Sequence, residues 1–389
     1  MNFDEIINRR GSHSAKWDML GKLYGMTDEN CLAMWVADMD FRPPAVVQKA
    51  VEDMAAHGIY GYYGEDSKYL AAIQWWMKTR HDWEVAPEAI LTTHGLVNGT
   101  AICVQALTEK GEGVAVMAPV YHAFGKVIKG LNRRMVELPL KNEQNRLEMD
   151  FDAWDALIDP GTKVLILCSP HNPGGRVWTV DELQGVAAFC EKHDLVLISD
   201  EIHHDLVFKG AKHTVFAKAA PEAAKRTIIM TSTTKTFNIA GAHTGNVIIP
   251  DADLRKKVAD EIWGLGISGN SFGMIMATAA YSPEGAQWLD ALMAYLDENR
   301  RVFDEGVNAI PGVKSMPLEA TYLAWVDFSG TGMEKAEFIR RVEKEGIATN
   351  YGEVFGLNGD NFLRFNLAMP RARITEAVGR LQRAFADLQ

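Results

Sequence analysis

Four short apolar runs in the middle of the chain constrain its fold more than any other feature of the sequence. They cover residues 114–117, 163–167, 195–198 and 227–230. Each run is continuous and rich in β-branched residues instead of alternating with polar ones. This pattern is typical of strands that are buried on both faces of a parallel sheet. The sequence therefore predicts an α/β fold in which such strands alternate with helices.

The segment between the second and third runs has the features of a helix. Thr179 is placed to cap its N-terminus, and Asp181 and Glu182 lie in its first turn, where acidic side chains are favoured. Apolar residues then recur at helical spacing up to Cys190. Residues 163–198 are thus predicted to form a βαβ unit. Open sheets built from such units bind their ligands beyond the carboxyl ends of the strands.

The two ends of the chain have a different pattern and predict a smaller α+β domain. We expect a large α/β domain over residues 46–285, with residues 1–45 and 286–389 forming the smaller one. In the C-terminal part, the apolar spacing predicts three helices and two strands. The helices are expected at 286–309, at 334–345 and from Ile374 onward, and the strands at 322–326 and 362–365.

Charge and hydropathy exclude several classes of protein. The formal net charge of the 389 residues is −11, and no basic run offsets it, so we expect no nucleic-acid partner. The apolar runs are too short to span a bilayer, and the N-terminal residues MNFDEIINRRGSH lack the apolar core of a signal peptide. The four cysteines show no CxxC pairing. These features together predict a cytoplasmic protein.

Unusual polar residues follow three of the predicted strands. Asn172 comes after the run at 163–167, Asp200 after 195–198 and Lys235 after 227–230. Because the carboxyl ends of parallel strands meet at one edge of a sheet, we expect these side chains to lie close together. Residues 91–99, LTTHGLVNG, indicate a strand that runs directly into a helix, whose free N–H groups favour an anion.

A lysine, a carboxylate, an amide and an anion-binding helix start fit one cofactor, pyridoxal 5′-phosphate. A lysine forms a Schiff base with this cofactor, and a carboxylate pairs with its pyridinium nitrogen. Each residue alone is weak support, since lysines near strand ends are usually solvated and Asn-Pro-Gly-Gly is usually a turn. The inference rests on their joint position. Phosphate donors are expected at Gly95, Ser232 and Thr234, and Tyr121 is placed to stack on the ring.

The chain resembles the fold-type I pyridoxal-phosphate enzymes of the class I/II aminotransferase superfamily. Within them it is most similar to the MalY/PatB group of cystathionine β-lyases, also called C–S lyases. The stretch WVADMDF at residues 35–41 is the motif most specific to that group. The other matching segments are GIYGY at 58–62, 169–176, 199–204, TKTFNIAG at 234–241 and LRFN at 363–366.

The resemblance implies a role for each candidate residue. Lys235 would be the Schiff-base lysine and proton shuttle, Asp200 the partner of the pyridinium nitrogen, and Asn172 the partner of the 3′-oxygen. Arg364 would bind the substrate carboxylate, since its planar fork suits bidentate binding. The remaining roles are ring stacking by Tyr121, phosphate binding by Gly95, Leu96, Ser232 and Thr234, hydrogen bonding near the ring by His203, and shaping of the substrate entrance by Trp35.

The resemblance also implies a homodimer with shared active sites, in which Tyr62 reaches the phosphate of the neighbouring subunit. The implied reaction is α,β-elimination from L-cystathionine or a cysteine S-conjugate, giving a thiol, pyruvate and ammonia. Transamination of an L-amino acid is the alternative, because it uses the same residues. The chain departs from the expected pattern at Ala242-His243, at His122 and at Gly174, which bears on the substrate side-chain pocket.

Two other classes of function are weighed against a cofactor enzyme. His203-His204 lies near Asp200 and Glu201, but the chain has no HExxH spacing and adjacent helical histidines point apart. We therefore expect no metal ligands, and for the histidine pair either a structural role or hydrogen bonding near the cofactor ring. A non-catalytic regulatory protein on the same fold is the second class. It predicts loss of Lys235 or Asp200, and the chain retains both.

Overall fold

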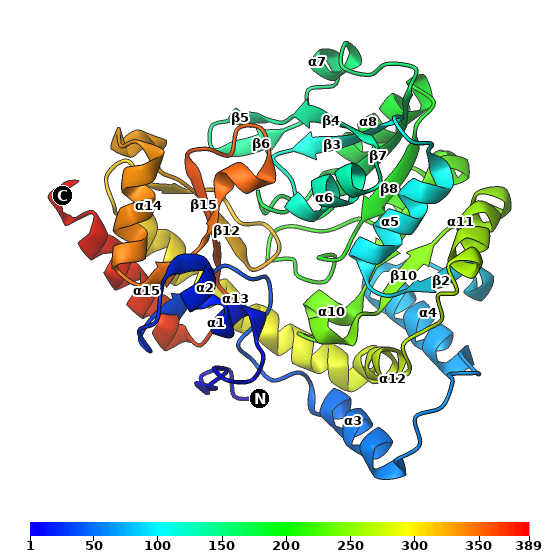
Figure 1. Ribbon diagram of the computed structural model, residues 1–389, viewed down its shortest axis with the longest axis horizontal. Helices are drawn as coiled ribbons and strands as arrows, with labels where there is room; N and C mark the ends of the chain where they lie inside the picture. Colours follow the sequence, from blue (N-terminus) through cyan, green and yellow to red (C-terminus); the bar gives the residue numbers. More distant parts are fainter. Residues whose placement is uncertain (389) are drawn as a thin grey trace.

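A seven-stranded sheet forms the centre of the larger part of the molecule (Figure 1). The computed structural model describes residues 1–388 of the chain. Strand β10 is antiparallel to both of its neighbours, and all the other strand pairs in this sheet are parallel, as expected for a mostly parallel fold. In spatial order its strands are β2 (Ile90–Thr93), β10 (Gly245–Ile248), β9 (Thr227–Thr231), β8 (Val196–Asp200), β7 (Thr162–Cys168), β3 (Gly113–Ala118) and β4 (Arg134–Pro139).

The central strands are buried on both faces, as their continuous apolar runs predict. In β7, Val164 and Ile166 belong to one hydrophobic cluster, and Leu165 and Leu167 belong to another. Successive side chains of a strand point to opposite faces, so the two clusters lie on either side of the sheet. Helices α5 (Leu96–Leu107), α6 (His122–Gly130) and α11 (Ala252–Gly264) cover one face, and α4 (Ser67–His81) and α8 (Val180–Lys192) contribute to the cluster on the other.

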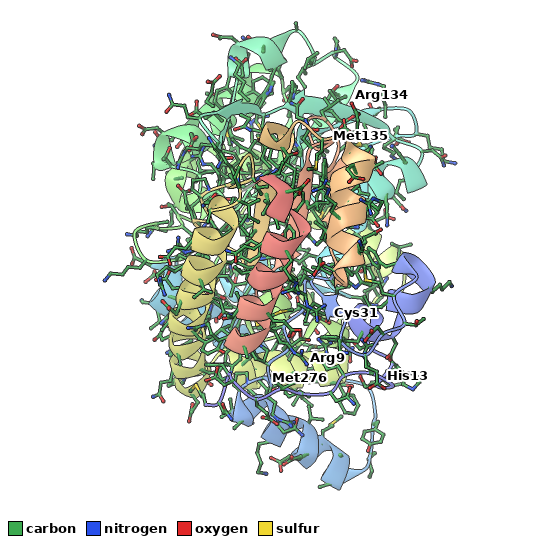
Figure 2. The ribbon with its side chains drawn as sticks, turned by 90° about the vertical axis from the view of Figure 1, so that its left-hand side faces the viewer. Arg9, His13, Cys31, Arg134, Met135 and Met276 are labelled. Atoms are coloured by element: carbon green, nitrogen blue, oxygen red, sulfur yellow. The ribbon has the colours of Figure 1, made fainter. Side chains whose placement is uncertain are left out.

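A four-stranded antiparallel sheet forms the second centre of the fold. Its order is β11 (Lys314–Ser315), β12 (Leu323–Asp327), β15 (Phe362–Asn366) and β14 (Asn350–Tyr351). The N-terminal part of the chain returns to this region, because β1 (Leu32–Ala33) pairs in parallel with β13 (Ile347–Ala348). Helices α13 (Pro283–Asn308), α14 (Lys335–Lys344) and α15 (Arg371–Ala384) lie side by side as its outer layer (Figure 2). The domain boundaries at residues 45 and 285 stay a prediction.

The remaining elements lie outside these two sheets. Strands β5 (Lys141–Glu143) and β6 (Arg146–Glu148) form a separate β-hairpin. No helix among residues 1–388 is long and apolar enough to cross a membrane. The other helices are α1 (Ala15–Asp18), α2 (Leu20–Tyr24), α3 (Ala45–His57), α7 (Phe151–Asp155), α9 (Phe216–Ala219), α10 (Thr233–Thr236) and α12 (Ser271–Ala280), with short 3₁₀ turns at Pro87–Ala89, Pro221–Arg226, Ala240–Ala242, Ser329–Thr331, Gly352–Phe355 and Ala386–Leu388.

The helix starts follow local capping chemistry. Thr179 accepts a hydrogen bond from the Glu182 N–H, and the Glu182 carboxylate accepts one from the Thr179 N–H, so the predicted cap is a complete capping box. The helix expected at 286–309 begins earlier, at Pro283, because Ser282 caps it and proline suits the first helical position. The last helix likewise begins at Arg371, three residues before the expected Ile374.

A buried group of charges fixes the N-terminal segment to residues 38–40. The Lys16 side chain is fully buried, and its Nζ lies 2.9 Å from Asp40 Oδ2. Asp40 Oδ1 accepts from Arg9 Nη1 at 2.7 Å and from Trp17 Nε1 at 2.9 Å. Burial alone would raise the pKa of Asp40, but Lys16, Trp17 and Arg9 hold it below its usual value. The carboxylate therefore stays ionised and compensates the buried ammonium.

We predict that Asp40→Asn destabilises the fold by about 3 kcal/mol, because it leaves the Lys16 charge buried with its main partner neutral. Chemical denaturation gives the free energy of unfolding. Glu5→Gln is the matched control, since Glu5 pairs with Arg42 on the exposed surface, and it should leave stability nearly unchanged. Equal stability of Asp40→Asn and the unmodified protein would contradict the assigned role of this ion pair.

Candidate active site

The strand-end residues meet in one cavity of about 190 Å³. Cys168, Asp200 and Met230 lie in register at the ends of β7, β8 and β9, which brings the residues after each strand to the same edge. Eight of the candidate site residues line the cavity. They are Gly95, Leu96, Tyr121, Asn172, Asp200, His203, Thr234 and Lys235, joined by Ala37, His94, Val97, Cys168, Ile202, Ala240 and His243.

Lys235 lies on the four-residue helix α10, directly after β9. Its Nζ donates a hydrogen bond to the backbone oxygen of Ala37 at 2.5 Å. Burial, aided by the Arg364 charge, lowers the pKa of the Lys235 amine to about 8, against the opposing effect of Asp38 and Asp200. A substantial fraction of this lysine is therefore neutral near pH 8, which an amine acting as nucleophile or base requires.

Asp200 is the buried carboxylate of the site. Its side chain accepts a hydrogen bond from the Ile202 N–H at 3.1 Å, and no cation within residues 1–388 forms a salt bridge with it. Burial raises the pKa of Asp200 to about 7. His203 lies in the same wall of the cavity, and burial holds the pKa of its imidazole well below the usual value. A buried carboxylate of this kind is suited to a cationic ligand nitrogen.

The part of the cavity wall at the start of α5 is suited to an anion. Gly95 precedes α5 with a φ of +83°, a conformation that glycine adopts without strain. The helix start at Leu96 therefore presents free backbone N–H groups. Ser232 and Thr234 lie beside it, with their hydroxyl oxygens 2.8 Å apart. Ser232 does not line the cavity itself. Its hydroxyl donates a hydrogen bond to the backbone oxygen of Thr244 at 2.7 Å.

Arg364 is buried behind the cavity. Its Nη1 donates to Asn172 Oδ1 at 2.9 Å, and its Nη2 donates to Asn350 Oδ1 at 2.5 Å. The same Nη2 also donates to the backbone oxygen of Trp35 at 3.0 Å. Burial lowers the pKa of Arg364 to about 10, so the guanidinium stays charged at neutral pH. This charge has no carboxylate partner among the described side chains and is suited to a carboxylate ligand.

A second cavity, of about 660 Å³, adjoins the first through Tyr121. Trp35 and His122 line it, together with Tyr24 and Tyr351. Burial lowers the pKa of His122 to about 4, with Arg364 and Lys126 acting in the same direction, so this imidazole is neutral at physiological pH. The second cavity is therefore walled mainly by neutral and aromatic groups next to the Tyr121 ring.

Some expected residues lie outside these two cavities. Tyr62 is fully exposed, in the segment between α3 and α4 that has no regular structure. Gly174 lines neither cavity and packs instead against Leu147 and His171, where a Cβ would come within 2.5 Å of Leu147 Cδ1 and 2.9 Å of His171 Nδ1. Gly174 therefore does not face either cavity, unlike His122 and His243.

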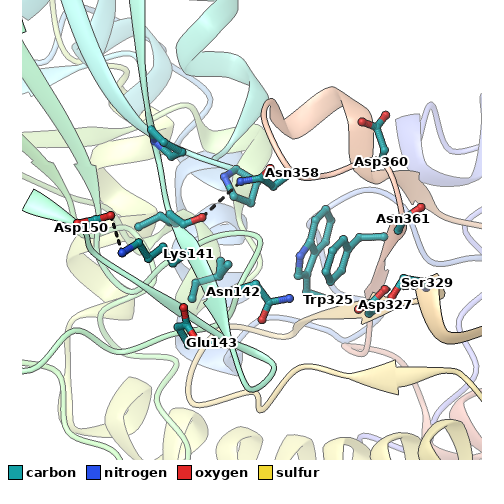
Figure 3. A pocket seen from close by; sticks show the side chains of 15 residues that line it. Lys141, Asn142, Glu143, Asp150, Trp325, Asp327, Ser329, Asn358, Asp360 and Asn361 are labelled. Atoms are coloured by element: carbon teal, nitrogen blue, oxygen red, sulfur yellow. Dashed lines mark hydrogen bonds and ion pairs between the residues drawn. The ribbon is translucent and has the colours of Figure 1, made fainter. Parts of the chain in front are cut away.

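A larger cavity, of about 750 Å³, lies between the β5–β6 hairpin and the four-stranded sheet (Figure 3). Trp325, Asn358 and Asp327 are among its lining residues, and Lys141 there pairs with Asp150 at 2.7 Å. None of the strand-end residues Asn172, Asp200 and Lys235 lines this cavity. We therefore place the candidate active site at the cavity of about 190 Å³ that Asn172, Asp200 and Lys235 line.

The chain is similar to known proteins over nearly its whole length. Residues 31–381 match the family described as aminotransferase class I and II. The chain belongs to that family. Cystathionine beta-lyase PatB of Bacillus subtilis is 38% identical over 99% of this chain and 100% of its own. Cystalysin of Treponema denticola, whose crystal structure contains pyridoxal 5′-phosphate, aligns with a TM-score of 0.95 at 34% identity over 100% of this chain and 99% of its own. The PLP-bound C–S lyase of Staphylococcus hominis aligns with a TM-score of 0.89 at 32% identity over 99% of this chain and 98% of its own.

Two contributors to the site were missed by sequence reasoning. The Ala37 oxygen that holds Lys235 is a backbone group, so no side-chain pattern marks it. Asn350 lies in register with Arg364 across the β14–β15 pair, but a two-residue strand leaves too short a pattern to predict that pairing. The only sequence signal for the contact between Ala37 and Lys235 is the motif at residues 35–41, whose resemblance implies a role at the substrate entrance and not a contact with the lysine.

We predict that Gly245→Ala weakens anion binding at the α5 start without touching the ligand. A Cβ at Gly245 would lie 2.6 Å from Leu96 Cδ2 and 2.9 Å from the Gly95 carbonyl carbon. Overpacking of this kind costs about 1–3 kcal/mol, so we expect roughly tenfold weaker binding of pyridoxal 5′-phosphate, measured by equilibrium titration of cofactor-free protein. Gly241→Ala is the control, because a Cβ there meets open space. Equal affinity of the two variants would contradict this account.

Proposed function

We propose that this protein is a pyridoxal-5′-phosphate-dependent C–S β-lyase that acts on L-cystathionine or a related cysteine S-conjugate. The observation that carries the proposal is one cavity lined by Lys235, by Asp200 and by the N-terminus of helix α5. The names of PatB and of the Staphylococcus hominis C–S lyase support the same activity, and the cofactor in cystalysin supports the same chemistry. Transamination is the alternative, because it needs the same groups.

The residues of the cavity fit the cofactor. Asp200 is a buried carboxylate without a cationic partner in the described chain, which suits the protonated pyridine nitrogen. Asn172 and His203 would lie against the ring and its 3′-oxygen, and Tyr121 would stack on it. The phosphate would be held by the α5 start at Gly95 and Leu96, with Ser232 and Thr234. When bound, the cofactor supplies an aldehyde for amines and an electron sink for a carbanion at Cα.

The protein groups then divide the reaction between them. Arg364 binds the substrate carboxylate, and Asn172 holds the guanidinium in place through its Oδ1. Lys235 Nζ removes the proton from Cα, because its lowered pKa makes the neutral amine available. Cleavage of the Cβ–S bond follows, and water completes the conversion to thiol, pyruvate and ammonia. The second cavity, at Trp35 and His122, would receive the sulfur substituent.

The surface supports a homodimer as the assembly. Several large apolar side chains are exposed near the α5 start and in the segment that carries Tyr62, and exposed apolar patches mark interaction sites. In a symmetric dimer, Tyr62 of the neighbouring subunit would contact the phosphate. The cysteines at positions 31, 103, 168 and 190 are all free and buried, which supports a reducing, cytoplasmic location.

The first test is the visible absorption spectrum of the purified protein after addition of pyridoxal 5′-phosphate. We predict a visible band that borohydride abolishes and that Lys235→Ala lacks, since the band requires a bond between Nζ and the cofactor. L-Cystathionine is then added to the unmodified protein, and pyruvate is assayed. Sustained pyruvate release is expected for a lyase. Slow loss of the band without pyruvate would assign an aminotransferase, and absence of the band would contradict both activities.

A complementation experiment tests the shared site. We predict that Lys235→Ala and Tyr62→Ala are each impaired alone, and that mixing the two variants under subunit exchange restores pyruvate formation. The heterodimer would contain one intact site, with Lys235 from one subunit and Tyr62 from the other. If Tyr62 serves its own subunit, no site in the mixture is intact and activity stays low. Mixing Lys235→Ala with Asp200→Ala is the control, because both residues belong to one subunit's cavity and no intact site can form.

A further inference from the structure

The turn after β8 presents side chains to two separate cavities. Asp200 and His203 face the candidate active site, whereas His204 and Asp205 line a different cavity of about 460 Å³. His81, at the end of α4, and His213 also line this cavity of about 460 Å³. The two cavities share no lining residue. Three histidines and a carboxylate thus gather at a place that the proposed lyase reaction does not use.

Three of these side chains present their ligand atoms to one point. His81 Nε2 lies 2.8 Å from Asp205 Oδ1, and His204 Nε2 lies 3.1 Å from Asp205 Oδ2. The two imidazole rings are 4.3 Å apart between centroids. One ligand atom from each residue can be chosen so that all three lie within 4.8 Å of one another.

His204 is the independent sign that this cluster is built to bind a ligand. Its side chain is fully buried. Neither ring nitrogen has a hydrogen-bond partner of acceptable geometry within residues 1–388, because the contact to Asp205 is poorly aligned. A buried imidazole without partners carries an unmet desolvation cost. A metal ion beside the ring would satisfy it.

We propose that His81, His204 and Asp205 bind a divalent transition-metal ion of the Zn²⁺ type. Zinc takes imidazole nitrogen and carboxylate oxygen at about 2.0–2.2 Å in tetrahedral geometry, so its ligand atoms lie roughly 3.4 Å apart. The observed separations of 2.8 Å (to Oδ1) and 3.1 Å (to Oδ2) are shorter than this, so the two imidazoles would have to move apart to admit an ion bound to one of these oxygens. Water from the adjoining cavity would complete the coordination. Two imidazoles disfavour Mg²⁺ and Ca²⁺, which prefer oxygen.

The surroundings of Asp205 support a ligand role. Trp76 Nε1 donates to Asp205 Oδ1 at 2.9 Å, and Thr236 Oγ1 donates to Oδ2 at 2.8 Å. Hydrogen bonds of this kind orient ligating carboxylates and tune the ion that they hold. Three cations line the cavity. Arg80 and Lys218 are paired with Asp290 and Asp82, which offsets their charges toward an entering ion, whereas Lys212 forms no salt bridge within residues 1–388.

The competing explanation is that the same cluster is a hydrogen-bonded contact that only joins α4 to the turn. Under that explanation, His81→Gln and His204→Gln would lower the melting temperature, and neither variant would change metal affinity. The metal proposal predicts a change in affinity itself. It does not depend on the lyase activity, because the measurement is metal binding and not turnover.

The experiment uses untagged holoenzyme without added amino acid, titrated with Co²⁺ as a spectroscopic stand-in for Zn²⁺. We expect ligand-field bands that saturate at one ion per chain and disappear when Zn²⁺ is added. His81→Gln and His204→Gln should each weaken metal binding by roughly 100-fold. Removal of a group that only orients a ligand already costs about 10- to 100-fold in affinity, so loss of a ligand should cost at least as much. His193→Gln is the matched control, since His193 also pairs with an aspartate, Asp155, at 2.8 Å, and it should bind as tightly as the unmodified protein.

Three results would overturn the proposal. The first is absence of saturable Co²⁺ bands in the unmodified holoenzyme. The second is affinity that stays unchanged in both His81→Gln and His204→Gln while His193→Gln also binds normally, which would assign the ion to another site. The third is strong thiolate-to-cobalt absorption, which would place the ion on a cysteine. Thermal melts of each variant without metal check that loss of binding is not loss of fold.

Discussion

The backbone oxygens of residues 35–41 accept hydrogen bonds from side chains of two distant parts of the chain. This segment has no regular ladder, so each buried carbonyl needs a partner from elsewhere. From β15, Arg364 donates to the Trp35 oxygen, and Asn366 donates to the oxygens of Val36 and Asp38. From the segment that follows β9, Asn238 donates to the oxygens of Met39 and Phe41, and Lys235 donates to that of Ala37. The segment therefore ties Lys235 to Arg364.

This arrangement gives a physical reason for three sequence motifs at once. TKTFNIAG contributes Lys235 and Asn238, LRFN contributes Arg364 and Asn366, and WVADMDF supplies the oxygens that all four of them bind. Tyr322 also donates to the Ala37 oxygen, at 3.0 Å. If Lys235 leaves that oxygen in the proposed reaction, the carbonyl keeps one donor, so the departure leaves no unsatisfied buried acceptor. The lysine can thus move without a large cost to the segment.

Sequence reasoning reached those parts of the fold and site that depend on local pattern. The buried strands, the capping box at Thr179 and the order of polar residues at strand ends follow from neighbours in the chain. The pattern could not show which groups distant segments bring together. Asn350 meets Arg364 through a register set by tertiary pairing, and His81 meets Asp205 across more than a hundred positions. The early helix start at Pro283 was, by contrast, available from its Ser-Pro signal.

The turn from Asp200 to Asp205 connects the two sites that these residues form. Lys235 and Thr236 are neighbours on α10, yet the lysine faces the active-site cavity while the threonine hydroxyl is bound to Asp205 at 2.8 Å. Because Lys235 and Thr236 are adjacent on the four-residue helix α10, the proposed metal site and the candidate active site are linked through neighbouring residues of the chain.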